Sequence, residues 1–129
     1  MARHRQFLIA AFAFVMFTQA AHGFTRRAFA WYPGTGSTSI PSGSLYARSS
    51  HGDRVDVERT GQGSYIVSFR GLARSGYQTG HVQVSPYGSV ARLCQPGGWF
   101  ANGEDLHAFV GCFDKRGARA DSAFTINVL

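Results

Sequence analysis

The chain has 129 residues, of which 44% are hydrophobic, 14% aromatic and only 16% charged, a composition too apolar and too aromatic for an intrinsically disordered protein. Its length supports one domain, and its 16 glycines and single lysine indicate short strands joined by turns rather than helices. The net charge of +6 comes from arginines scattered along the chain, whereas nucleic-acid binding needs a concentrated basic stripe, so we expect no nucleic-acid partner.

Residues 1–23 have the composition of a secretory signal peptide, with a basic start, an apolar run of 11 residues and small residues before the expected cleavage site at Phe24. A membrane anchor is the alternative, but a helix of that length covers only about half of the hydrocarbon core of a bilayer. Cleavage would leave 11 basic against seven acidic residues, a net charge of +4. We therefore predict that residues 24–129 form a single exported β domain, secreted, periplasmic or at the cell surface, with no integral membrane segment.

The first strand is predicted over residues 24–32 and the second over residues 45–49, with a loop rich in glycine and serine between them. Pro33 ends the first strand because proline cannot donate a hydrogen bond to a sheet. Phe29 and Trp31 alternate within that strand. We expect Trp31 to fill the core, as most tryptophans on strands do.

A β-hairpin is predicted next, from two segments in which apolar and polar side chains alternate. The link between the segments, residues 60–63, contains two glycines that can take the positive φ needed to close the turn. The apolar side chains on one face of this hairpin are Val55, Val57, Tyr65, Val67 and Phe69.

The remaining strands are predicted over residues 81–87, 90–94, 106–113 and 123–128. Pro96 and two glycines are expected to break the chain after residue 94. The strand at 106–113 has apolar side chains on both faces, which predicts a central or doubly covered strand. Seven or eight short strands, with turns about every ten residues, predict an all-β fold: a compact antiparallel β-sandwich or small barrel.

The two cysteines, Cys94 and Cys112, are the only ones in the chain. An even number of cysteines in an exported protein predicts a disulfide, and two cysteines allow one pairing. A reactive thiol pair is the alternative, but it lacks the Cys-x-x-Cys spacing and a basic activator.

Three segments resemble a domain of unknown function found in secreted bacterial proteins, singly or as tandem copies. They are the glycine-flanked hairpin at residues 55–72, the H-V-Q-V-S-P-Y-G segment at 81–88, and residues 110–126 with V-G-C-F and D-S-x-F. The resemblance covers nearly all of the mature chain. It implies a β domain with a Cys94–Cys112 bridge outside the cytoplasm, and it brings no catalytic residues.

No motif for catalysis, metal binding or cofactor binding was found. Of the candidate bases His51, His81 and His107, the last two stand alone on predicted strands rather than in a cluster of metal-ligating residues, so surface histidines are the favoured interpretation. Chemistry by a serine would need a base in hydrogen-bond reach, and the Gly-x-Ser-x-Gly motif is absent. We therefore predict no catalytic, metal or cofactor residues.

The candidate contact surface consists of aromatic residues near glycine- and proline-rich loops, whose rings stack on sugars or anchor a partner protein. These residues are Tyr32, Tyr77, Trp99 and Phe100. For Trp99, a core position and a surface position are equally supported. Two functions remain open: a noncatalytic module that binds an envelope polysaccharide or another protein, and a small secreted hydrolase that uses one of the histidines with an acidic partner.

Overall fold

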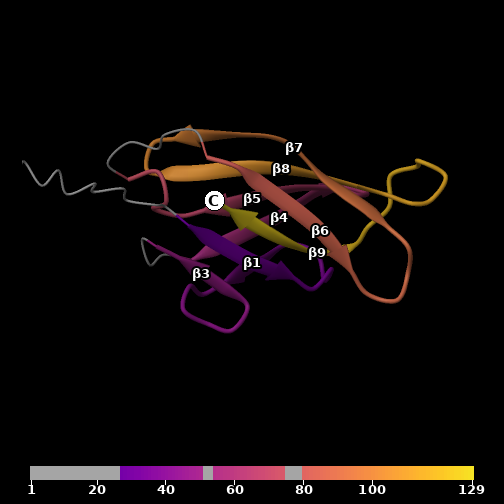
Figure 1. Cartoon of the computed structure of the whole chain (residues 1–129), viewed down its shortest axis with the longest axis horizontal. Helices are drawn as coiled ribbons and strands as arrows, with labels where there is room; N and C mark the ends of the chain where they lie inside the picture. The colour runs from indigo at the N-terminus through magenta and orange to yellow at the C-terminus, as the bar shows by residue number, and fades with distance from the viewer. Residues whose placement is uncertain (1–26, 51–53, 75–79) are drawn as a thin grey trace, which may run out of the picture.

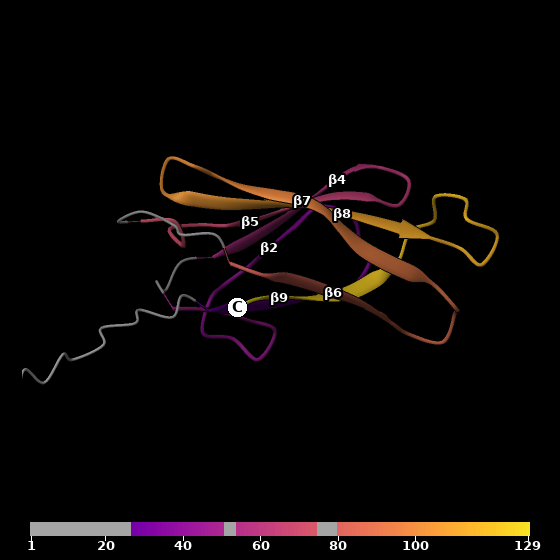
Figure 2. The same ribbon diagram turned by 45° about the horizontal axis from the view of Figure 1, so that its top comes forward.

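The computed structural model describes residues 27–50, 54–74 and 80–129. Within these residues the fold is all-β, and nine strands form two antiparallel sheets that lie face to face (Figures 1 and 2). The four-stranded sheet has the order β3-β1-β9-β6 and the five-stranded sheet the order β2-β4-β5-β8-β7. The strands are β1 (Ala28–Tyr32), β2 (Thr38–Ile40), β3 (Ala47–Ser49), β4 (Val55–Gly61), β5 (Ser64–Phe69), β6 (Val82–Tyr87), β7 (Leu93–Asn102), β8 (Asp105–Phe113) and β9 (Ala123–Val128).

The predicted antiparallel β-sandwich is confirmed, with nine strands instead of seven or eight. The additional strand is β2, a three-residue edge strand inside the predicted glycine- and serine-rich loop. β7 also differs, because the glycines after Pro96 do not end it. The pairing register between β7 and β8 shifts between Pro96 and Gly98, so this segment forms a bulge within one long strand.

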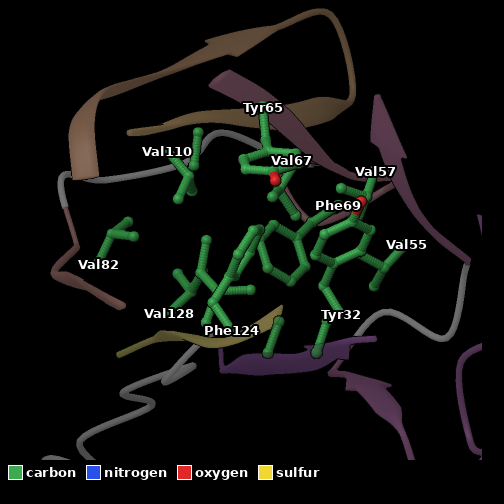
Figure 3. Close-up of a cluster of buried hydrophobic side chains, with 14 of the residues drawn as sticks. Tyr32, Val55, Val57, Tyr65, Val67, Phe69, Val82, Val110, Phe124 and Val128 are labelled. Atoms are coloured by element: carbon green, nitrogen blue, oxygen red, sulfur yellow. The ribbon is translucent and has the colours of Figure 1, made fainter. Parts of the chain in front are cut away.

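The core lies between the two sheets, and Figure 3 shows side chains from both sheets meeting there. The predicted hairpin is confirmed as β4 and β5, in which Val55 opposes Phe69 and Val57 opposes Val67. On β8, Leu106, Ala108, Val110 and Cys112 are buried. β8 is an interior strand, as predicted, but its outer face is not covered, because Phe109 is 42% exposed.

The predicted positions of Trp31 and Tyr32 are both wrong. Tyr32 is fully buried and points from β1 into the core (Figure 3), whereas Trp31 is 48% exposed on the outer face of the same strand. Adjacent residues of a strand face opposite sides, and Tyr32 shares its side with the buried Ala28 and Ala30. Phe29 and Trp31, which alternate with the buried residues of β1, therefore lie on the outer face.

The Cys94–Cys112 disulfide is confirmed. The two cysteines are directly opposite each other on β7 and β8, with their Cα atoms 4.1 Å apart and both side chains buried. The bridge therefore joins neighbouring strands of one sheet and does not link the two sheets. It attaches β7, at the edge of the five-stranded sheet, to the interior strand β8.

The described part of the chain contains no helix with the length and apolar character of a membrane span.

Candidate functional site

Of the four aromatic residues predicted as a contact surface, the three that the structure describes do not share one surface. Phe100 is 46% exposed on β7, and Trp99 is half-buried and packs against the core. Tyr32 is fully buried, so it cannot contact a ligand. Tyr77 lies outside the described residues. Phe100 alone of these four is shown to be an exposed ring.

A different group of aromatic residues lies on the outer face of the four-stranded sheet. Tyr46, Trp31 and Tyr87 are 59%, 48% and 40% exposed, and we call them the aromatic strip. The ring centroids of Trp31 and Tyr87 are 5.7 Å apart. Trp31 donates a backbone hydrogen bond to the Tyr46 carbonyl at 2.7 Å. Because Ala30 and Ala47 are opposed and buried, the next pair, Trp31 and Tyr46, lies on the outer face.

Tyr87 reaches Trp31 across β9. Its hydroxyl donates to the Tyr32 carbonyl on β1 at 3.0 Å, which holds the ring over the sheet. The residue opposite Tyr87 on β9 is Ala123, whose short side chain leaves room for the ring. Burial raises the pKa of Tyr87, and the neighbouring Tyr46 adds to the shift. At neutral pH the hydroxyl therefore stays protonated and keeps its donor role.

Polar side chains flank the aromatic strip on the same face. Thr125 of β9 is opposite Trp31 on one side and opposite Ser85 of β6 on the other. Two residues along, Asn127 is opposite both Phe29 and Gln83. Hydroxyl and amide groups can both donate and accept hydrogen bonds. The face therefore combines flat apolar rings with the donors and acceptors that sugar hydroxyls require.

The outer face of the five-stranded sheet carries a second, smaller aromatic group. Phe100 stacks on Phe109, with ring centroids 5.8 Å apart, and lies 5.3 Å from the His107 ring. His107 Nδ1 is 2.7 Å from the Ser68 hydroxyl oxygen on β5. Ser68 is only 7% exposed. The carbonyl carbon of a substrate therefore cannot reach the Ser68 hydroxyl.

Two acidic residues lie near this pair. Asp105 is two residues before His107 on β8, and its carboxylate accepts hydrogen bonds from the Arg70 side chain and from the Gly71 N–H. Asp56 is opposite Ser68 on β4, and its carboxylate forms an ion pair with Arg70 at 2.7 Å. In a Ser-His-Asp triad, the carboxylate accepts a hydrogen bond from the histidine and thereby fixes the tautomer of its ring. The Ser68–His107 contact is accounted for as a cross-strand polar pair.

Of the other two candidate histidines, the structure describes His81. His81 is exposed, and its backbone pairs with Leu129 at the end of β9. His51 lies outside the described residues. Among residues 27–50, 54–74 and 80–129, no group of three or more His, Cys, Asp or Glu side chains could hold a metal ion.

The alternation of residues along β6 and β1 is a signal in the sequence for two rings of the aromatic strip. Tyr87 alternates in phase with Gln83 and Ser85, both polar and exposed, and out of phase with the buried Val82. That phase places Tyr87 on an outer face. On β1, Trp31 is out of phase with the buried Ala28 and Ala30, so the same alternation places Trp31 on the outer face.

Comparisons with models of protein families, with curated proteins and with solved structures gave no match for this chain. The resemblance to a secreted bacterial domain therefore stays a prediction.

Proposed function

We propose that this protein is a noncatalytic, exported binding module and that its aromatic strip binds an envelope polysaccharide. The observation that carries the proposal is the group of three neighbouring exposed rings, Tyr46, Trp31 and Tyr87, on one sheet face. Exposed rings of this size are costly to hydrate and are commonly found where a protein meets a partner.

The rings are suited to stacking on sugars because they are already fixed before the ligand arrives. Trp31 lies in the middle of the four-stranded sheet, between β3 and β9, and Tyr87 is held by its hydrogen bond to the Tyr32 carbonyl. A ring that is ordered in the free protein loses little conformational entropy on binding. Export is supported by the composition of residues 1–23 and by the disulfide, which is typical of proteins in oxidising compartments.

The test is glycan binding by single variants on the two opposite faces. The wild-type protein is run through gels that contain soluble glycans, and the affinity of each glycan that retards it is measured by calorimetry. We expect Trp31→Ala to weaken binding by at least about tenfold, which corresponds to about 1.4 kcal/mol. Phe100→Ala is the matched control, because Phe100 is equally exposed but belongs to the other sheet.

The proposal is wrong if no glycan retards the wild-type protein. It is also wrong if Trp31→Ala and Phe100→Ala reduce binding equally, because the strip would then have no special role. Circular dichroism of both variants checks that the sandwich is intact. Since Trp31 is outside the core, neither change should unfold the protein.

A small secreted hydrolase is the second candidate, and the 2.7 Å contact between Ser68 and His107 is the observation that favours it. The burial of Ser68 argues against it. Hydrolase activity that disappears in Ser68→Ala and His107→Ala but persists in His81→Ala would establish the enzyme. Equal activity in all three variants would exclude the Ser68–His107 pair as the active site, and no activity in the wild type would exclude the hydrolase.

A further inference from the structure

Two arginines share the outer face of the four-stranded sheet with the aromatic strip. Arg48 of β3 is directly opposite Phe29 of β1, and Arg27 precedes Phe29 by two residues on the same side of the chain. Both arginines are exposed. With Phe29 and Asn127 they line a hollow of about 420 Å³.

These two guanidinium groups have no acidic partner in the described part of the chain. By contrast, four other arginines each form an ion pair with a carboxylate: Arg54, Arg59, Arg70 and Arg74. A guanidinium group has five N–H donors in a planar fork that fits a carboxylate. Arg27 and Arg48 therefore present to the hollow donors that form no ion pair with a carboxylate of the described residues.

The hollow and the aromatic strip form one continuous surface along β1. Arg27, Phe29 and Trp31 follow one another on the same side of the strand, so the Cα atoms of Arg27 and Trp31 are about 13 Å apart at the usual rise of a strand. An extended polymer that stacks on Trp31 and runs along β1 passes over the hollow as well.

We propose that the polysaccharide bound by this face is acidic, with the carboxylates of its uronic acid units held by Arg27 and Arg48. This inference rests on the proposed function, because the sugar rings are placed by the aromatic strip. Carboxylates placed between two guanidinium groups form charge-assisted hydrogen bonds, which are stronger than hydrogen bonds between neutral groups. Neutral glycans cannot form these charge-assisted hydrogen bonds, so their affinity is lower.

The test compares a polyuronate, such as polygalacturonate, with neutral dextran on three proteins. The first is wild type, and the second is the double variant Arg27→Ala with Arg48→Ala. The third is the matched control Lys115→Ala with Arg116→Ala, which removes the same charge from an exposed turn between β8 and β9. Affinities are measured by calorimetry at low salt and again at high salt.

We expect wild type to bind the polyuronate at least about tenfold more tightly than dextran at low salt, and less so at high salt, because ions screen exposed charges. The Arg27 and Arg48 double variant should lose this preference while its binding of neutral glycan is unchanged. The Lys115 and Arg116 control should keep the preference. Unchanged melting temperatures are expected for both double variants, because all four side chains are exposed.

The inference is overturned if the two double variants lose equal affinity for the polyuronate, since net charge alone would then explain the effect. It is also overturned if wild type binds dextran as tightly as the polyuronate. Trp31→Ala separates this failure from failure of the proposed function. If Trp31→Ala weakens dextran binding while the arginine variants change nothing, the binding module stands and its acidic specificity does not.

Discussion

At the scale of single residues, Asp121 links the end of the chain to the β4–β5 hairpin. Its carboxylate accepts hydrogen bonds from the Arg59 side chain, from the buried Gly63 N–H at 2.7 Å and from the Tyr65 hydroxyl at 3.1 Å. The Arg59 hydrogen bond, followed by that of Gly63, lowers the pKa of Asp121 to about 2. Burial raises the pKa of Tyr65 to about 12, so its hydroxyl remains a donor.

Asp121 should make stability depend on pH between about 4 and 2. A carboxylate whose pKa is lowered by folding contributes stability above its unfolded pKa, about 3.9, and that stability is lost as the pH falls through the folded value. The free energy of unfolding of the wild type should therefore fall across this window more than that of Asp121→Asn. Urea titrations at pH 5 and at pH 2 measure the difference.

Asp121→Ala measures how much stability the contacts of Asp121 contribute at pH 5, where the carboxylate of the wild type is charged. Asp121 is 44% exposed, so solvent screens its ion pair with Arg59, and we assign most of the loss to the unsatisfied Gly63 N–H. A buried unpaired donor costs about 1–3 kcal/mol. If Asp121→Ala and Asp121→Asn were as stable as wild type at pH 5, the contacts of Asp121 would not matter for the fold.

At the scale of elements, both the backbone conformation and the neighbouring atoms require a glycine at position 63, in the β4–β5 turn. Its φ is +64°, and a Cβ atom there would collide with the Cys112 carbonyl oxygen and approach the Ala120 nitrogen to 2.7 Å. Gly103 in the β7–β8 turn has nearly the same φ, +60°, but open space around it. The two glycines therefore separate the cost of a left-handed backbone from the cost of packing.

Gly63→Ala should destabilise the protein well beyond Gly103→Ala. The left-handed backbone alone costs a non-glycine residue about 1–2 kcal/mol, which is our expectation for Gly103→Ala. Gly63→Ala adds a collision with two backbone groups of neighbouring segments, so we expect about 4 kcal/mol or more, a loss in the range that marks a severe steric defect. Chemical denaturation of both variants measures these values, and equal losses would show that the neighbours of Gly63 move aside freely.

The elements that could be predicted from the sequence are those with regular alternation. The β4–β5 hairpin was predicted because both strands alternate over several residues and two glycines separate them. β2 could not be found in this way, because three residues are too few for a periodic signal. The sequence predicts a break after residue 94, because a segment of Pro96 and two glycines has the same composition in a bulge as in a turn.

At the scale of the whole molecule, the aromatic strip depends on which strands become neighbours. Trp31, Tyr46 and Tyr87 belong to three segments, and β9, from the end of the chain, lies between β1 and β6. Alternation can place each ring on an outer face, but it does not give the strand order that brings the rings together. The sequence therefore predicted a β domain with exposed aromatic side chains, but not which of them form one surface.

The disulfide affects the molecule as a whole through β7, which follows β6 of one sheet and forms the edge of the other. It closes a loop with a sequence separation of 18, and a closed loop of this size restricts the unfolded chain by about 3 kcal/mol in the loop-entropy model. Cys94→Ala with Cys112→Ala should therefore lower the free energy of unfolding by about 2–5 kcal/mol. Alanine is preferred to serine because both positions are buried.

Reductant provides the control for this last change. Dithiothreitol should lower the denaturation midpoint of the wild type toward that of the double variant and leave the double variant unchanged. Intact-mass analysis of purified, unreduced wild-type protein should show two hydrogens fewer than the reduced chain. Thiols that titrate in the native protein would contradict the bridge, and a double variant as stable as wild type would show that β7 is held by its hydrogen bonds with β8 alone.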